Sequence, residues 1–259
     1  MKTPVKAKNR IVVWEALDPT DEVVAAAGRL YESTLDPDER IPWEWIEKSV
    51  LSRSWWKPGG WSRHLILAAP MKRVNDPAAL AGYCFAAFLP GFGGYVSYMG
   101  VSPEYRGRGV GRRLFEHAFK HLAADAHGVD EPMPFVAWES KPPGPNDRPE
   151  EQANWAARLA LFAKVGGHHV SGLTLWQPNY ADPAGPPVGL DLFVKPIDTP
   201  TAAFDSVKLR EIAAEFYRRV YRLSPDDPLV LRTQTDTHVP KLDDLPKARP
   251  TRRAGLQPA

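Results

Sequence analysis

The feature that most constrains this chain is a glycine- and arginine-rich loop between a strand-like run and an amphipathic helix. The run ends at Val101, a turn containing Pro103 follows, and residues 106–113 read Arg-Gly-Arg-Gly-Val-Gly-Arg-Arg. The first N–H groups of a helix lack intrahelical acceptors, and the helix N-terminus carries partial positive charge. Exposed amides flanked by guanidinium groups suit phosphate oxygens. The sequence therefore predicts a polyphosphate site at this loop.

The composition limits the class of protein. The chain has 259 residues, of which 43% are hydrophobic, and this supports a substantial core. Its net charge of +2 makes nucleic acid an unlikely partner. The single cysteine, Cys84, cannot form an internal disulfide, and we expect a reducing, cytoplasmic compartment. No apolar run in the sequence is long enough to span a bilayer, so we expect no membrane association.

Hydrophobic periodicity and turn residues predict alternating strands and helices. Strands are expected over 10–16, 63–69, 79–89, 94–101, 134–140, 168–177 and 188–195, and helices over 18–35, 42–50, 109–127, 150–164 and 203–221. Short turns join the second, third and fourth strands, which indicates an antiparallel meander. The helix after the glycine loop connects two strands as a crossover, which indicates that those two strands are parallel.

Three kinds of phosphate-binding loop compete for this stretch. A nucleotide-triphosphate loop needs four residues between its glycines and then Lys-Ser/Thr, which the chain lacks. A dinucleotide loop needs a third glycine where this chain has Arg112. Arg106, Gly109 and Gly111 instead satisfy Arg-x-x-Gly-x-Gly. With this motif and this order of elements from about Ile11 to Ile197, the sequence resembles the GNAT N-acetyltransferase superfamily.

The resemblance implies an α/β (α+β) fold. We expect a mixed, mostly antiparallel central sheet of about seven strands, with helices on both faces and a cleft where the fourth and fifth strands splay apart. The expected organisation is a disordered lead-in over 1–9, a GNAT-like acyltransferase domain over 10–198, a C-terminal helical extension over 199–235 and a flexible basic tail over 236–259.

The resemblance also implies acyl-CoA, most simply acetyl-CoA, as the cosubstrate, with no metal. In such proteins the loop amides hold the pyrophosphate, and the pantetheine arm pairs with the end of the fourth strand as an added strand would. The corresponding residues here are Met99, Gly100 and Val101 on the strand, and Arg106, Gly107, Arg108, Gly109, Val110, Gly111 and Arg112 in the loop.

Glu139 is the candidate general base, because it ends the fifth strand after an apolar run and matches a glutamate that is the base in some family members. An apolar setting would raise the pKa of its carboxyl towards neutrality. The family often has a tyrosine acid at the position of Phe162, which cannot donate a proton. The acid is then water, a side chain such as Tyr98 or Tyr180, or absent.

The acceptor site of the family is built by the first two helices, their connection and the loop between the last two strands. Here those segments hold an aromatic and acidic set: Trp43, Trp45, Trp55, Trp56, Trp61, Tyr180, Glu39, Glu44 and Glu47. Such a lining suits an amine, although tryptophans are more often core residues and glutamates surface residues.

Two functions from different classes follow. The first is an acyl-CoA-dependent N-acyltransferase in which an amine attacks the thioester directly. The alternative is a non-catalytic acyl-CoA-binding or regulatory domain, and Phe162 motivates it. The sequence leaves open the acceptor, the acyl length and the oligomeric state, a homodimer included.

Overall fold

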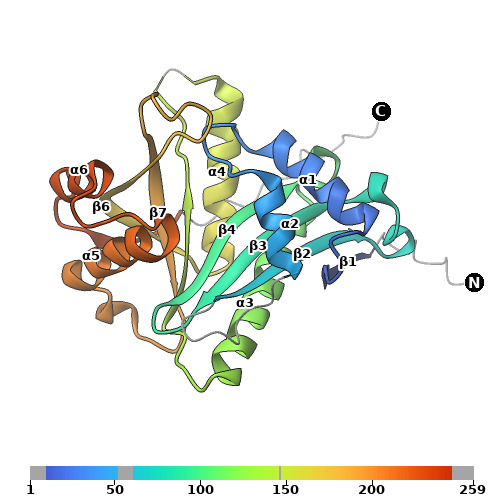
Figure 1. Cartoon of the computed structure of the whole chain (residues 1–259), viewed down its shortest axis with the longest axis horizontal. Coiled ribbons are helices and arrows are strands. Elements are labelled where there is room, and N and C mark those ends of the chain that lie inside the picture. The colour runs from blue at the N-terminus through green and yellow to red at the C-terminus, as the bar shows by residue number, and fades with distance from the viewer. Residues whose placement is uncertain (1–9, 52–60, 146, 247–259) are drawn as a thin grey trace, which may run out of the picture.

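The computed structural model describes residues 10–51, 61–145 and 147–246. Within these residues the chain forms one sheet of eight strands in the order β1-β2-β3-β4-β5-β7-β6-β8 (Figure 1). The strands are β1 (Ile11–Glu15), β2 (Ser62–Pro70), β3 (Gly82–Leu89), β4 (Gly93–Val101), β5 (Phe135–Ser140), β6 (His168–Gln177), β7 (Val188–Pro196) and β8 (Lys241–Asp244). The α-helices are α1 (Glu22–Thr34), α2 (Trp43–Leu51), α3 (Val110–Gly128), α4 (Pro149–Lys164), α5 (Ser206–Glu215) and α6 (Pro228–Asp236). The predicted fold class and the order of its elements are confirmed.

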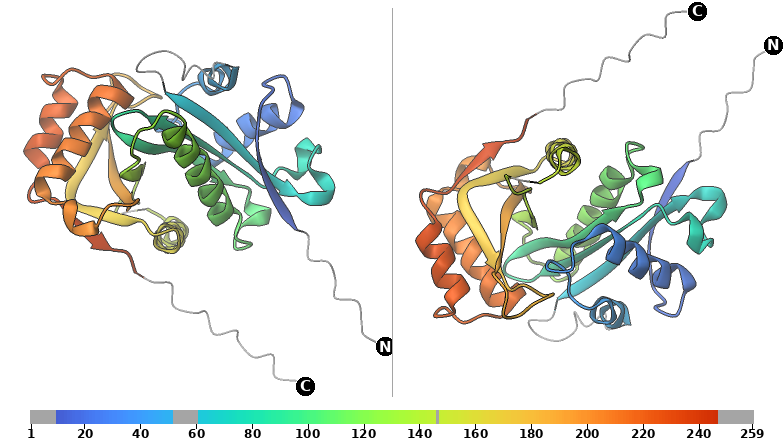
Figure 2. Two further views of the ribbon diagram at one scale, coloured as in Figure 1. Left: turned by 90° about the horizontal axis from the view of Figure 1, so that it is seen from below. Right: turned by 90° about the horizontal axis from the view of Figure 1, so that it is seen from above.

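Helices cover both faces of the sheet. Alternate residues of one strand point to opposite faces, and β2 shows this clearly. Ile66 and Ala68 pack in one cluster with α3, whereas Leu65 and Leu67 pack in another with α1 and α2. Figure 2 shows α3 and the α1–α2 pair on opposite sides of the strands. The sheet is therefore buried on both faces in this half of the molecule.

The β4–β5 pair is the irregular point of the sheet. These strands run parallel and pair only at Gly94–Val136 and Tyr95–Ala137. The register between β3 and β4 also shifts, since Ala86 faces Val96 whereas Phe85 faces Tyr98. A bulge of this kind turns the strand and re-aims its side chains. Beyond Tyr95 the two strands therefore separate, as predicted.

The segment after β7 is integral to the core. Buried side chains of α5 and the following turn pack with β5, β6 and β7 in one cluster. The helix predicted over 203–221 is divided into a 3-10 turn (Thr201–Ala203), α5 and a single π-helical stretch, η6 (Phe216–Tyr221). π-Helical stretches are rare and frequently lie at functional sites.

The C-terminal tail is partly structured. We predicted flexibility over 236–259, and this is wrong for Lys241–Asp244, which forms β8 and pairs antiparallel with His168–Ser171 of β6. Residues 247–259 and the predicted lead-in over 1–9 lie outside the described residues, as do Trp55 and Trp56. The other domain boundaries stay predictions. Among the described residues no helix is both long and apolar enough to cross a membrane.

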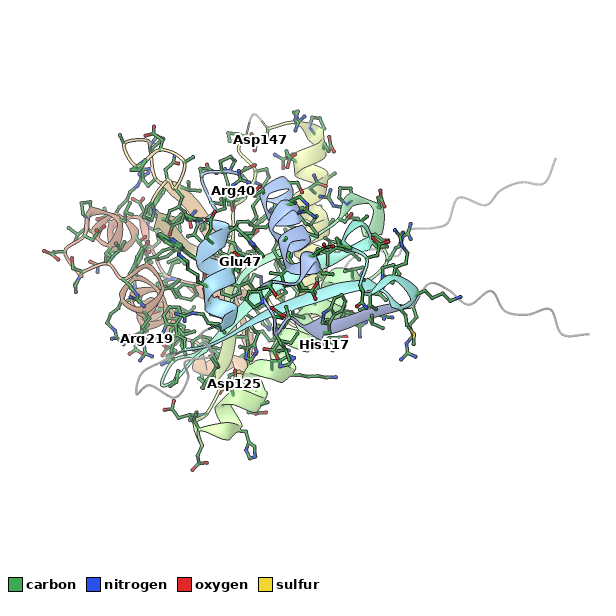
Figure 3. All side chains as sticks on the ribbon, turned by 45° about the vertical axis from the view of Figure 1, so that its right-hand side comes forward. Arg40, Glu47, His117, Asp125, Asp147 and Arg219 are labelled. Carbon is green, nitrogen blue, oxygen red and sulfur yellow. The ribbon has the colours of Figure 1, made fainter. Side chains whose placement is uncertain are left out.

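A buried histidine ties β1, β2 and α3 together on the face opposite α1. His64 lies 2.8 Å from Glu15 through Nδ1 and 2.5 Å from Asp125 through Nε2, and Asp125 projects from the C-terminal half of α3 (Figure 3). Burial alone would lower the pKa of His64, but hydrogen bonds and charge from Asp125 and Glu15 outweigh it and raise the pKa to about 9. His64 is therefore a cation between two carboxylates at neutral pH.

This arrangement predicts a loss of stability at alkaline pH. The pKa of His64 in the folded state lies above its unfolded value, so its contribution is fully present below about pH 6.5 and is lost as pH rises through about 9. We expect the free energy of unfolding to fall by about 3 kcal/mol over this range. Urea unfolding at several pH values measures it. The variant His64→Gln should lack this pH-dependent loss, and parallel curves for the two proteins would contradict the assignment.

Candidate functional site

The gap between β4 and β5 opens into one continuous cleft of about 1530 Å³. One end is lined by the loop before α3, from Arg106 to Arg112. The other end lies between the α1–α2 connection, the β6–β7 loop and η6, and is lined by Glu39, Tyr180 and Tyr221. Glu139, from the end of β5, lines the same cleft. The fold thus joins the predicted phosphate loop, the predicted base and the predicted acceptor region in one cavity.

The glycine loop has the backbone shape that an anion cradle requires. Gly107 and Gly109 have φ of 71° and 79°, which is the left-handed region that favours glycine. A Cβ built on either would meet nothing within 4 Å, so conformation and not crowding selects glycine at both positions. Gly109 is the N-cap of α3 and offers no side chain to its first-turn amides. Those amides are available to a ligand in the cleft.

The other loop residues divide into two kinds. The exposed side chains of Arg106 and Arg112 line the cleft. Arg108 does not line it, and its guanidinium lies 5.4 Å from the centre of the Tyr105 ring. Val110 is buried, so this residue can offer a ligand its backbone alone. Gly111 is needed for helix packing, since a Cβ there would lie 2.9 Å from a methyl group of Leu161 on α4.

The backbone edge of the last residues of β4 faces the cleft. Met99, Gly100 and Val101 all line the cleft, and β5 pairs with none of them. Gly100 is buried, and a Cβ at this position would collide with Tyr83 and Thr34 on the α1 side. The backbone here is free to pair with an extended ligand, as the prediction requires.

Glu139 has an unusual environment for a carboxylate. Its Oε1 accepts hydrogen bonds from the hydroxyls of Tyr95 at 2.6 Å and Tyr221 at 3.2 Å. Its Oε2 is buried and has no hydrogen-bond partner. Burial raises the pKa of Glu139 to about 7, the two tyrosines lower it in part, and the nearby charge of Glu39 adds to the rise. One oxygen is thus held in place, the other is buried without a hydrogen-bond partner, and the carboxyl takes up or releases its proton near neutral pH.

Tyr221 was missed by the sequence reasoning. It lies on η6, and the π-helical turn carries its hydroxyl to within hydrogen-bond distance of both Glu139 and Gln177. Tyr217 on the same element donates to the carbonyl of Trp176 instead. Tyr217 and Tyr221 are four residues apart in one predicted helix, and this spacing was the sequence signal that could have drawn attention to Tyr221. The C-terminal extension therefore contributes directly to the site.

The acidic half of the predicted acceptor lining is smaller than expected. Glu39 lines the cleft, and burial raises its pKa to about 7 against the influence of Lys141. Glu44 and Glu47 do not line the cleft. Lys141 Nζ lies 2.9 Å from Asp38 and 4.0 Å from Glu39, which ties the end of β5 to the α1–α2 connection.

The aromatic set is also divided. Trp45, Trp61 and Tyr180 line the cleft, whereas Trp43 packs on Tyr31 with ring centres 5.5 Å apart and lies outside it. The backbone N–H of Tyr180 donates to the carbonyl of Asp38, so the β6–β7 loop docks on the α1–α2 connection. These contacts close the end of the cleft opposite the glycine loop.

Phe162 marks a hydrophobic side of the cleft. It is 4% exposed, and its ring packs on Phe193 and Trp138 with centres 4.7 and 5.4 Å apart. Tyr98 and Tyr180, the alternative acids, both line the cleft. Burial raises the pKa of Tyr180 to about 12, so its hydroxyl stays protonated at neutral pH.

Four of the histidines lie beside carboxylates. His121 packs on His64 with ring centres 4.9 Å apart and lies 3.9 Å from Glu15. His168 and His169 pair with Asp244 and Asp191 at 3.1 and 3.4 Å. The expected absence of a metal stays a prediction.

Comparisons with known proteins agree with this geometry. Residues 29–137 match a family model described as the Acetyltransferase (GNAT) family. Residues 29–137 therefore carry the sequence features of the GNAT acetyltransferase family. The matched segment runs from α1 to β5 and includes the glycine loop. No curated protein matches the chain by sequence.

Solved structures show the GNAT fold over more of the chain than the family model. A protein described as an acetyltransferase of the GNAT family from Bacteroides thetaiotaomicron is 14% identical, with a TM-score of 0.53 over 82% of this chain and 99% of that one. A structure of the NatC complex bound to Gag peptide and CoA contains a chain that is 15% identical, with a TM-score of 0.50 over 72% of this chain and 98% of that one. At these identities the similarity establishes the fold.

The hydrogen bond from Tyr221 predicts a measurable change in Glu139. Removing the hydroxyl in Tyr221→Phe takes away a donor to the charged carboxylate, so the pKa of Glu139 should rise further, by about half to one pH unit. Carbon NMR of labelled glutamate carboxyls follows this titration. The control Tyr217→Phe removes a neighbouring hydroxyl that bonds to Trp176, and it should leave the titration unchanged. Equal shifts in both variants would contradict the role of Tyr221.

Proposed function

We propose that this protein is an acyl-CoA-dependent N-acyltransferase that uses acetyl-CoA. The observation that carries the proposal is the single cleft that joins the glycine loop to Glu139 through the gap between β4 and β5. An anion cradle, an unpaired strand edge and a carboxylate with a pKa of about 7 lie along one cavity in that order. A long, extended thioester with a polyphosphate at one end matches the order of these features along the cleft.

Two parts of the cleft would bind CoA. The amides of residues 107–112, with the side chains of Arg106 and Arg112, would hold the pyrophosphate. The edge of Met99, Gly100 and Val101 would pair with the pantetheine amides. Arg108, stacked on Tyr105, is left out of this set. The cosubstrate supplies the thioester carbonyl that the acceptor amine attacks.

Glu139 is proposed as the general base. Its free Oε2 would accept a proton from the acceptor ammonium, directly or through water, while Tyr95 and Tyr221 hold Oε1. The neutral amine then forms a C–N bond with the acyl carbon and the C–S bond breaks. The new amide nitrogen gives up its extra proton to water, and the thiolate takes a proton from water, Tyr98 or Tyr180. A thiolate is a tolerable leaving group, so Phe162 at the usual acid position does not prevent turnover.

A second candidate function is acyl-CoA binding without catalysis. The packing of Phe162 against Trp138 and Phe193 favours it, because no hydroxyl stands at the usual acid position. Release of thiol from acetyl-CoA with a panel of amines separates the two functions. Binding of CoA without turnover of any amine would favour the second. Residence in the cytoplasm, absence of nucleic-acid binding and the oligomeric state remain predictions from the sequence.

The proposed pyrophosphate site at the glycine loop predicts the effect of a negative side chain placed there. Gly109→Glu places a bulky anion in the left-handed N-cap of α3, against the position proposed for the pyrophosphate. We expect CoA binding to fall below detection by calorimetry, because like charges would meet in the cradle. The matched control is Gly128→Glu at the opposite end of the same helix, where a side chain also meets nothing within 4 Å. An unchanged affinity in Gly109→Glu would contradict the loop assignment.

The base assignment predicts a pH effect. A base with a pKa of about 7 is active when deprotonated, so kcat/KM should rise with pH through about 7. Glu139→Gln should lower turnover by about 100-fold or more and remove that rise, with the affinity for CoA retained. Initial rates of thiol release between about pH 5.5 and 8.5, chosen to span about 1.5 units either side of the pKa, test it. A pH profile that overlays the parent's would show that Glu139 is not the base.

A further inference from the structure

Two arginines at the acceptor end of the cleft lack anionic partners. Arg63 on β2 and Arg222, directly after η6, both line the cleft beyond Glu139. Among the described residues, neither guanidinium forms an ion pair or a side-chain hydrogen bond. Arg112, Lys141 and Arg158, which also line the cleft, each have a side-chain partner. Within the part of the chain that the structure describes, the donors of both arginines are therefore available to a ligand.

The surroundings of Arg63 destabilise the positive charge on its guanidinium. Burial and the charge of Arg222 both lower the pKa of the Arg63 guanidinium, and no acid offsets them. Its guanidinium lies 5.2 Å from the centre of the Trp61 ring. Stacking of this kind uses the face of the guanidinium and leaves its in-plane N–H donors for a ligand. An arginine held this way is suited to bind carboxylate or phosphate oxygens through paired hydrogen bonds.

The strand register relates Arg63 to the proposed base. Arg63 is paired with Ala87, Ala87 with Tyr95, and Tyr95 with Ala137. Side chains of residues directly paired across strands project from one face of a sheet. Glu139 is two residues beyond Ala137, so it projects from that face as well, in keeping with its hydrogen bond to Tyr95.

Arg222 is the second arginine at this end of the cleft, and it is positioned by η6 and not by a strand. It follows Tyr221, whose hydroxyl contacts Glu139, and it ends η6 in the left-handed conformation with φ of 56°. Positively charged groups thus stand on β2 and at the end of η6, while the carboxylate that would take the amine proton stands on β5. Strands β2 and β5 are three positions apart in the sheet, about 14 Å at ordinary strand spacing.

We propose that Arg63 and Arg222 form an anion subsite, and that the acceptor is an amine that also carries a carboxylate or phosphate group. The amine faces Glu139, and the anionic group is bound by the two guanidinium groups. Because these features lie on strands three positions apart, the amine and the anion are separated by a spacer. This inference rests on the proposed function for the role of the amine, whereas the anion subsite itself is independent of turnover.

Matched amines test the subsite. Thiol release from acetyl-CoA is measured with γ-aminobutyrate and butylamine, phenylalanine and phenethylamine, and phosphoethanolamine and ethanolamine. We expect the anionic member of at least one pair to have the higher kcat/KM. The amino acids and the phosphate ester distinguish carboxylate from phosphate, and the γ- and α-amino acids report the spacing. Equal or higher kcat/KM for the member without an anionic group in every pair would overturn the proposal.

The variants Arg63→Gln and Arg222→Gln test the residues. Each should lower kcat/KM for the acceptor that carries an anionic group by about 10- to 100-fold, mainly through KM, with little change for its counterpart without that group. The KM for acetyl-CoA should stay unchanged. The matched control is Arg232→Gln on α6, whose guanidinium also stacks on a tryptophan, 3.4 Å from the ring centre of Trp176, but does not line the cleft. A similar loss for both members of a pair would show that the arginines do not recognise the anion.

Equilibrium binding separates this inference from the proposed function. Calorimetry of the same amines against the CoA-loaded protein reads the subsite without catalysis. If no amine is turned over but the anionic members bind and Arg63→Gln abolishes that binding, the proposed function fails and the subsite stands. If amines are acetylated without regard to anionic groups, the subsite fails and the proposed function stands.

Discussion

Strands β4 and β5 pair at only two positions, Gly94–Val136 and Tyr95–Ala137, and then leave a row of backbone groups without a strand partner. Buried N–H and C=O groups without partners are costly, so such a row is stable only where a ligand or water can satisfy it. Both strands are otherwise fixed, β4 by β3 and β5 by β7. The cleft is therefore enforced by the sheet, and the glycine loop and Glu139 are placed by their positions on its two edges.

The C-terminal segment contributes polar and charged side chains to the cleft. Phe204, Leu209 and Phe216 are buried in the same cluster as β5, β6 and β7, so the segment is anchored by apolar packing. That packing delivers Tyr221 to the carboxylate of Glu139 and Arg222 to the wall of the cleft. The π-helical geometry of η6 matters here because its wider turn changes which side chains face the sheet. What looked in sequence like an appendage is part of the site.

Two buried carboxylates, Glu39 and Glu139, have similar pKa values but different partners. Burial raises the pKa of both Glu39 and Glu139 to about 7. Lys141 lies near Glu39, while Glu139 has two tyrosine donors on one oxygen and none on the other. A carboxylate with a fixed orientation and a free oxygen is suited to proton transfer, whereas one beside a lysine is suited to binding. Hence the two groups are assigned different roles.

The sequence by itself determined most elements from β1 to β7 and their order, because these depend on local periodicity and turn residues, and it predicted the phosphate loop from glycines that permit left-handed backbone. It also selected Glu139, since that residue ends an apolar strand. It could not separate Arg108, which stacks on Tyr105, from Arg106 and Arg112, which line the cleft. Nor could it show that Gly111 serves the contact between α3 and α4. The contact of Tyr221 with Glu139, and the position of Arg63 and Arg222 in the same cleft, were decided only by tertiary structure, because sheet register and core packing bring together residues far apart in the sequence, and no local pattern encodes this.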